Sequence, residues 1–173
     1  MGTRNILRFK CNVHFLKTNS GKKGEGMPVV RNAQYYFKEG FCWNNVLNPQ
    51  ARLLKVKLKR ASVNDVGSMS LMPLVDNVPS KFIIGLLNSN LIFDYYRVFL
   101  NCSVNIQIND LRQIPIIIPN QEELSNLIEL VNEAILIKET FFKYGESDKD
   151  LTKLESIEKK IDNFVSYLYD KQS

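Results

Sequence analysis

The sequence predicts an α+β fold, in which a small, mixed, strand-rich domain packs on apolar helices and is followed by a two-helix antiparallel C-terminal arm. Segments typical of strands lie between residues 34 and 58. An apolar stretch with helical spacing follows at about 80–100, and two long amphipathic segments end the chain. We therefore expect residues 1–119 to form the strand-rich domain and residues 120–173 a helical hairpin that acts as a scaffold or docking arm.

Three segments in the first third have the composition of strands. The run from Gln34 to Phe37 is aromatic, and Gly40 to Trp43 follows a turn as a short strand. From Leu54 to Leu58 apolar residues alternate with lysines, which places the apolar side chains on a core face and the lysines on the opposite face. This pattern indicates either a basic-faced strand or an edge strand that lysines protect against aggregation.

Two apolar helices are expected at about 80–100. Ser80 is a suitable N-cap for the first, which starts at Lys81 and runs to Leu87. The polar run from Asn88 to Asn90 separates it from a second helix over Leu91 to Leu100. Because both helices are hydrophobic on most faces, we expect them to be buried against the sheet.

Residues 103–118 again have the pattern of strands. Apolar and polar residues alternate from Ser103 to Asn109, and a second strand is expected over Leu111 to Ile118. The isoleucines from Ile116 onward form the kind of apolar run that is typical of a covered strand.

The C-terminal arm shows helical signals at its start and along its length. Asn120 and Glu123 have the spacing of a capping box, and apolar residues keep helical spacing as far as Phe142. After a polar break at residues 144–149 a second amphipathic helix begins near Leu151. Two helices joined by a short loop are expected to pack antiparallel.

The charge is distributed unevenly along the chain. Met1 to Arg60 holds 13 Lys and Arg against two Asp and Glu, a net charge of +11, whereas the remaining residues hold 10 and 16, a net charge of −6. Such asymmetry indicates a polyanionic partner for the basic part, because lysines and arginines that neutralise phosphates release condensed counterions. The alternative is a basic surface that is simply solvated.

The sequence offers no recognisable catalytic set. It has a single histidine, His14, and three cysteines without a Cys-x-x-Cys pair, so we predict reduced thiols and no metal site. The run from Asn48 to Gln50 lacks the second proline and the aromatic residue with which amino-methylating enzymes hold a flipped base. We expect no catalytic residue and no cofactor in this chain, which alone is then not an enzyme.

No secretory signal is visible, and polar residues interrupt the longest apolar stretch, from Phe82 to Leu100. We therefore expect a cytoplasmic protein without a membrane partner.

Several blocks of the sequence resemble parts of a known protein family. The block from Arg31 to Trp43 (RNAQYYFKEGFCW) resembles one near the start of the recognition domains of type IIG restriction–modification enzymes and related large adenine-specific DNA methyltransferases. Gly85 to Leu91 (GLLNSNL) resembles a helix break shared by those domains and by type I restriction specificity subunits. Phe99 to Ile116, with its Ile-Pro-Ile step, and the last helix from Glu158 to Tyr169 are similar to later parts of these proteins.

The resemblance, which spans roughly Arg31 to Tyr169, implies a target recognition domain that binds double-stranded DNA sequence-specifically beside the methyltransferase domain of its parent polypeptide. The catalytic domain, with its S-adenosylmethionine, would lie in a part of the parent that is missing here. The chain is then expected to be a fragment of a longer bacterial defence protein.

The residue types suggest which side chains would contact DNA. Basic side chains would bind the DNA backbone, which positions the protein without specifying a sequence: Lys22, Lys23, Lys38, Arg52, Lys55, Lys57, Lys59 and Arg60. Side chains with paired donors and acceptors, or a guanidinium, are the candidates for base readout: Arg31, Asn32, Gln34, Asn44 and Asn45. Trp43 is expected either to stack on DNA or to belong to the core.

Three other interpretations stay open. The chain could be half of a type I restriction specificity subunit, or a protein–protein interaction module that works through the helices beyond Asn120. It could also be a divergent nuclease fragment.

Overall fold

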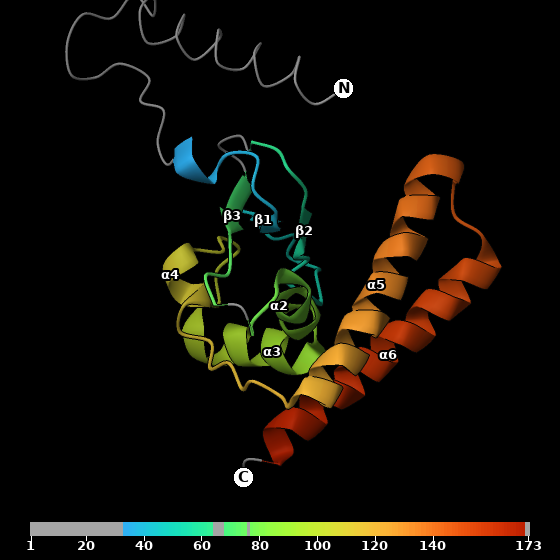
Figure 1. The fold of residues 1–173 in the computed structure, drawn as a ribbon. Coiled ribbons are helices and arrows are strands. Elements are labelled where there is room, and N and C mark those ends of the chain that lie inside the picture. The colour runs from blue at the N-terminus through green and yellow to red at the C-terminus, as the bar shows by residue number, and fades with distance from the viewer. Residues whose placement is uncertain (1–32, 64–67, 76, 172–173) are drawn as a thin grey trace, which may run out of the picture. The chain divides into compact units, whose positions relative to one another are not determined.

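The computed structural model describes residues 33–63, 68–75 and 77–171. The chain divides into two compact units, Met1–Tyr36 and Phe37–Ser173, and the second contains almost all of the described elements (Figure 1). This second unit has an α+β fold, in which a three-stranded antiparallel sheet packs with helices.

The described part of the first unit consists of a single 3-10 turn, η1 (Ala33–Tyr35), and the residue after it. The predicted strand from Gln34 to Phe37 is therefore wrong. Phe37 has a φ of 61°, in the left-handed region, which no regular strand can accommodate. The aromatic composition favoured a strand, but the backbone turns at this point before the sheet begins.

The sheet has the strand order β2-β1-β3, with β1 (Gly40–Asn44) in the centre. Its neighbours β2 (Lys57–Lys59) and β3 (Ser68–Leu71) both pair with β1 in antiparallel register. The predicted strand at Gly40 to Trp43 is confirmed, whereas β3 lies in a segment without a strand pattern in the sequence. Hydrogen bonds to β1 stabilise this strand, although its own sequence does not favour one.

The alternating segment before Arg60 is a strand only at its end. Leu54 and Val56 are buried and Lys57 is exposed, as the alternation predicts. Lys55 has a φ of 54°, however, so the chain turns there and regular strand geometry begins only at Lys57. A continuous basic-faced strand is therefore not formed.

The two apolar helices are present with shifted boundaries. Helix α2 (Ser80–Leu87) begins one residue early, because Pro79 is the N-cap and Ser80 already belongs to the helix. Its last six residues are all buried, and it packs against β1 on one side and against the C-terminal hairpin on the other (Figure 1). The expectation that this helix is core is confirmed.

The second apolar helix is two elements, α3 (Asn90–Tyr95) and the π-helical turn η2 (Tyr96–Leu100). Ile92 and Phe93 are buried, but Val98 and Phe99 are each 72% exposed. The expectation of burial on most faces is therefore wrong for η2. The wider π-helical turn rotates its last residues away from the positions that α-helical spacing would give.

The predicted strand from Ser103 to Asn109 is a loop that leads into a short helix, α4 (Ile108–Leu111). The Asp110 carboxylate accepts hydrogen bonds from Asn101 Nδ2 (2.6 Å), from Tyr96 Oη (3.3 Å) and from the backbone N–H of Gln107 (3.3 Å). These bonds close the chain on itself, so only an isolated bridge to the segment after β1 remains of the expected strand pairing.

The predicted strand from Leu111 to Ile118 is also absent. Ile116 and Ile118 are about half exposed, and the segment runs without regular structure from α4 to the C-terminal hairpin. Tyr169 donates a hydrogen bond to the Pro115 carbonyl and so ties the segment to the last helix. Pro115 itself has no backbone N–H to offer a sheet, which weakens any strand pairing here.

The C-terminal arm is an antiparallel hairpin of α5 (Gln121–Tyr144) and α6 (Asp148–Asp170), as predicted (Figure 1). The capping box is confirmed, because Asn120 Oδ1 accepts from Glu123 N at 2.9 Å and a Glu123 carboxylate oxygen accepts from Asn120 N at 3.0 Å. One buried cluster of apolar side chains joins sheet, α2, α3 and hairpin.

Candidate nucleic-acid interface

The cations predicted to contact DNA fall into three groups. Lys22 and Lys23 lie outside the described residues. Five others are exposed: Lys38, Arg52, Lys55, Lys57 and Arg60. The remaining one, Lys59, is buried.

Lys59 is only 4% exposed, although the alternation predicted it beside Lys57 on an outer face. Its Nζ donates to the backbone carbonyls of Lys38 (2.8 Å) and Ser62 (2.7 Å). The ammonium thus links the segment before β1 to the segment after β2. Loss of water around the buried ammonium lowers the pKa of Lys59 below its ordinary value. Lys59 is therefore corrected from a DNA contact to a structural residue.

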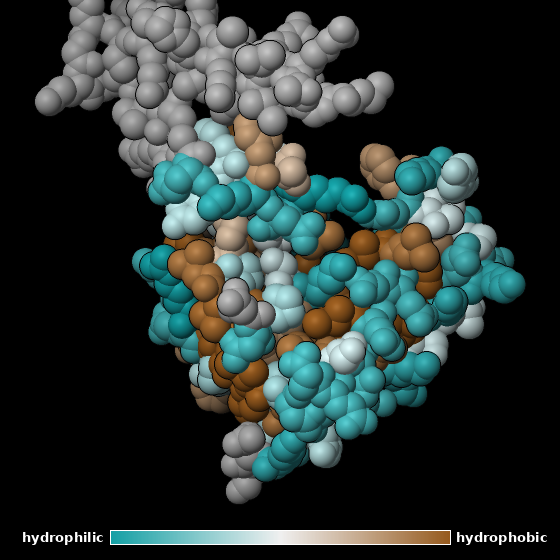
Figure 2. Space-filling view, in the orientation of Figure 1, coloured by the Kyte–Doolittle hydropathy of each residue, from teal (hydrophilic) through white to brown (hydrophobic). Residues whose placement is uncertain are grey.

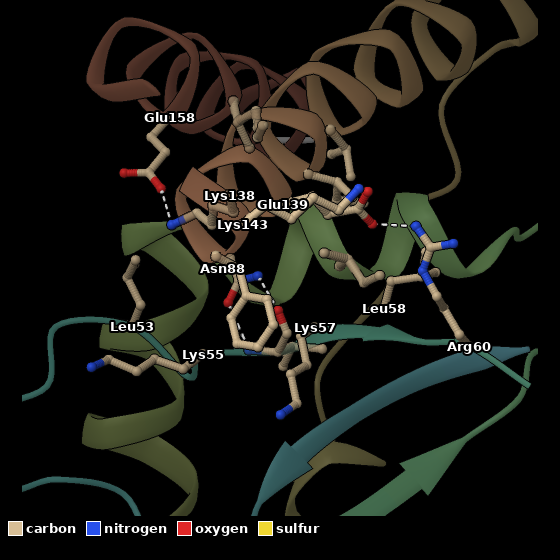
Figure 3. Close-up of a pocket in the computed structure, with 18 residues that line it drawn as sticks. Leu53, Lys55, Lys57, Leu58, Arg60, Asn88, Lys138, Glu139, Lys143 and Glu158 are labelled. Carbon is tan, nitrogen blue, oxygen red and sulfur yellow. Dashed lines mark hydrogen bonds and ion pairs between the residues drawn. The ribbon is translucent and has the colours of Figure 1, made fainter. Parts of the chain in front are cut away.

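The exposed cations Lys55, Lys57 and Arg60 share one groove with two lysines of α5, Lys138 and Lys143. We call this cavity the basic groove. It has a volume of about 820 Å³ and lies between residues 53–60, α2 and the α5–α6 hairpin (Figure 3). Apolar side chains are visible in the hollow beside the hairpin, with hydrophilic ones around it (Figure 2).

The basic groove carries an excess of positive charge. Its lining contains five cations and two carboxylates, those of Glu139 and Glu158, which leaves a formal charge of +3. Arg60 pairs with Glu139, and Lys138 pairs with Glu158 at 3.0 Å (Figure 3). These four side chains are all more than a third exposed, so each pair contributes little to stability.

Three lysine side chains of the basic groove are uncompensated among the described residues. The ammonium groups of Lys55, Lys57 and Lys143 make no hydrogen bond and no ion pair there, and all three residues are exposed. Ammonium groups that are both solvated and uncompensated are available for an anionic ligand at little desolvation cost.

Asn88 holds one wall of the groove in place. Its side-chain amide bonds the backbone of Val56 twice, with Nδ2 donating to the carbonyl (2.7 Å) and Oδ1 accepting from the N–H (2.9 Å). The amide thus pairs with residue 56 as a neighbouring strand would, at the point where Lys55 turns the backbone. This contact fixes Lys55 and Lys57 relative to α2 (Figure 3).

Gly85 allows the floor of the groove to form. A Cβ placed on Gly85 would lie 2.9 Å from Val131 Cγ2 and 3.3 Å from Leu127 Cδ1, closer than side chains normally approach. Only a glycine therefore lets α2 and α5 lie this close together.

Ser89 and Asn90, which follow Asn88, also have structural roles. Ser89 Oγ caps α3 by accepting from Ile92 N, and the backbone N–H and side-chain amide of Asn90 both donate to the Asp162 carboxylate on α6 (2.8 and 2.5 Å). The run from Asn88 to Asn90 thus connects the groove wall, α3 and the hairpin.

The two candidates for base readout that lie in the second unit, Asn44 and Asn45, do not line the groove. Arg31 and Asn32 lie outside the described residues, and Gln34 is exposed on η1 in the first unit. Asn44 is exposed at the end of β1, and Asn45 follows it, with its backbone carbonyl accepting from Ile106 N at 2.8 Å.

Trp43 belongs to the core. Its side chain is fully buried, and Nε1 donates to the Ile106 carbonyl at 3.4 Å. It is thereby excluded from stacking on a nucleic-acid base.

Lys138 and Lys143 were not among the predicted contacts, because in the sequence they lie about 80 residues from the rest of the site. For Lys138 a signal was available, because it lies three residues after Ile135 and four before Phe142, and residues at these spacings share one face of a helix.

No model of a known protein family matches the chain, and no curated protein matches it. Within the described ranges, no helix combines the length and the apolar character that crossing a membrane requires. Nor do three His, Cys, Asp or Glu side chains of this part of the chain gather where they could hold a metal ion.

Proposed function

We propose that the chain binds double-stranded DNA as the target recognition domain of a restriction–modification, adenine-specific DNA methyltransferase. The observation that carries this proposal is the convergence of cations from two distant segments, residues 53–60 and α5, around one groove with a formal charge of +3. In the sequence, the net charge of +11 over the first 60 residues is also typical of a chain with a polyanionic partner. The family resemblance described above supplies the biological setting.

In this proposal Lys55, Lys57 and Lys143 contact backbone phosphates, and they position the protein without selecting a sequence. Arg52, an exposed residue three positions before Lys55 in the sequence, is a further candidate contact. Base readout then belongs to amide side chains outside the groove, of which Asn44 is exposed at the end of β1. Methyl transfer, with S-adenosylmethionine, is assigned to a separate domain of the parent polypeptide.

The resembling blocks support the proposal in a specific way. Gly85, Asn88, Ser89 and Asn90 hold the scaffold together, and none of them needs to touch a ligand to do so. A scaffold motif combined with a separate set of exposed contact residues is the arrangement expected of a module that serves many target sequences.

The experiment is a titration of a labelled DNA duplex with the full chain at increasing salt. Replacing Lys55 and Lys57 together with Gln should reduce the slope of log affinity against log salt by about 1.8, since each lost phosphate contact accounts for about 0.9. The matched control replaces Lys159 and Lys160, two exposed lysines of α6 outside the groove, with Gln. Equal slopes for both double variants would remove the groove lysines from the interface.

A further inference from the structure

The floor of the basic groove is apolar and open, which a duplex backbone does not require. Leu53, Leu58, Ala134 and Ile135 line it and are only partly buried, and Phe142 at its edge is 94% exposed. An exposed apolar surface with a polar rim is typical of a protein interaction site. Phosphates can meet the rim lysines, but they gain nothing from this floor.

We propose that the basic groove is the docking site of an acidic, amphipathic α-helix of a partner protein. Charge complementarity identifies the occupant, because Lys55, Lys57 and Lys143 line the groove together with its apolar floor and have no anionic partner among the described residues. A helix with one apolar face and carboxylates along its flanks satisfies the floor and the rim together. A basic helix of the same shape would be repelled.

The shape of the α5 wall fits a helical occupant. Ile135, Lys138, Phe142 and Lys143 all line the groove, so one face of α5 faces it over about two turns, or about 12 Å. A second helix can set its ridges into the grooves of such a face. The segment around Val56, held by Asn88, forms the opposite wall and keeps the space open.

The docking helix and DNA would compete, since both use Lys55 and Lys57. The inference itself stands on the groove's floor and charges and does not require that DNA binds. If the chain fails to bind duplexes but binds the helix, the proposed function fails and this inference holds.

The test uses a fluorescein-labelled peptide of about three turns, with Leu on one helical face, Glu on its flanks and Ala elsewhere, added to the full chain. The control peptide has Lys in place of every Glu. Fluorescence anisotropy should show that the Glu peptide binds at least about tenfold tighter than the Lys peptide.

Two matched pairs of variants locate the site. Phe142→Ala and Lys143→Gln should each weaken the Glu peptide about threefold or more. Tyr144→Ala, which removes another exposed aromatic at the end of α5, and Lys149→Gln, at the start of α6, should leave its affinity unchanged. None of the four side chains is buried, so we expect all four variants to fold.

Equal binding of the two peptides, or equal losses in the groove variants and their controls, would overturn the proposal. The proposal would also be overturned if Phe142→Ala weakened duplex binding as strongly as it weakens binding of the Glu peptide, because the apolar floor would then contact DNA.

Discussion

Asn88 hydrogen-bonds both backbone groups of Val56, 32 residues earlier in the chain, and thereby takes the place of a neighbouring strand. The contact joins the C-terminus of α2 to the segment that carries Lys55 and Lys57. Removing this contact should therefore change both the free energy of unfolding and the position of the groove lysines.

Asn88→Leu should destabilise the protein by about 1–3 kcal/mol, because the part-buried N–H and C=O of Val56 would lose their partners. Urea denaturation measures the loss, and hydrogen exchange should accelerate at Val56 in particular. Asn126→Leu, an exposed change on α5, is the control. Unchanged exchange at Val56 in the Asn88 variant would contradict this role.

Gly85→Ala should destabilise the protein although alanine is the better helix former by about 1 kcal/mol. The new methyl would meet Val131 Cγ2 at 2.9 Å, and overpacking of this kind costs about 1–3 kcal/mol. In a Val131→Ala background the substitution should cost less, which a double-mutant cycle of unfolding free energies detects. Additive losses would mean that the two side chains do not meet.

Tyr96 should ionise late. Burial and the neighbouring Asp110 raise its pKa to about 12, and burial likewise raises the pKa of Tyr169 to about 12. The folded state holds these protons more tightly than the unfolded state, so their contribution to stability is complete below pH 10 and is lost as the pH rises toward 12.

Tyrosinate absorbance measures this ionisation directly. Tyr96→Phe should remove one late-titrating group, and Tyr169→Phe the other. If Tyr96→Phe left the number of late groups unchanged, the assignment of the buried hydroxyl would be wrong.

Lys57 and Lys59 should differ although they stand two residues apart. Lys57→Gln should lower the salt slope of duplex binding by about 0.9, whereas Lys59→Gln should leave it unchanged. Lys59→Gln should instead reduce the free energy of unfolding, because the carbonyls of Lys38 and Ser62 lose a charged donor. A reduced slope for Lys59→Gln at full stability would contradict its burial.

How much of this could be predicted depends on the distance over which each signal acts. The capping box of Asn120 and Glu123 is correctly predicted because both of its hydrogen bonds lie within four residues. Periodicity also identified α2, α5 and α6, whose apolar faces are long enough to be seen in sequence.

The errors arise where distant contacts decide the local structure. The alternation from Ser103 to Asn109 is that of a strand, yet Asp110 draws Asn101 and Gln107 into a closed loop. Lys59 continues the lysine alternation, but the carbonyls that bury its ammonium come from segments on either side of β1 and β2. No local pattern records either contact.

The candidate site was only half predictable for the same reason. Lys55, Lys57 and Arg60 stand out as a basic cluster in the sequence, whereas Lys138 and Lys143 join them only through the packing of α5 against α2. The groove exists because Gly85 permits that packing. The sequence contains the glycine but does not reveal that Val131 packs against it.

Sequence-specific DNA recognition is tested most directly by incubating the full chain with a pool of randomised duplexes and sequencing the bound fraction. We expect one short common sequence to become enriched. The Lys55→Gln, Lys57→Gln double variant should enrich that same sequence at lower yield, because phosphate contacts position the protein without specifying bases. A bound fraction with the composition of the starting pool would contradict sequence-specific recognition.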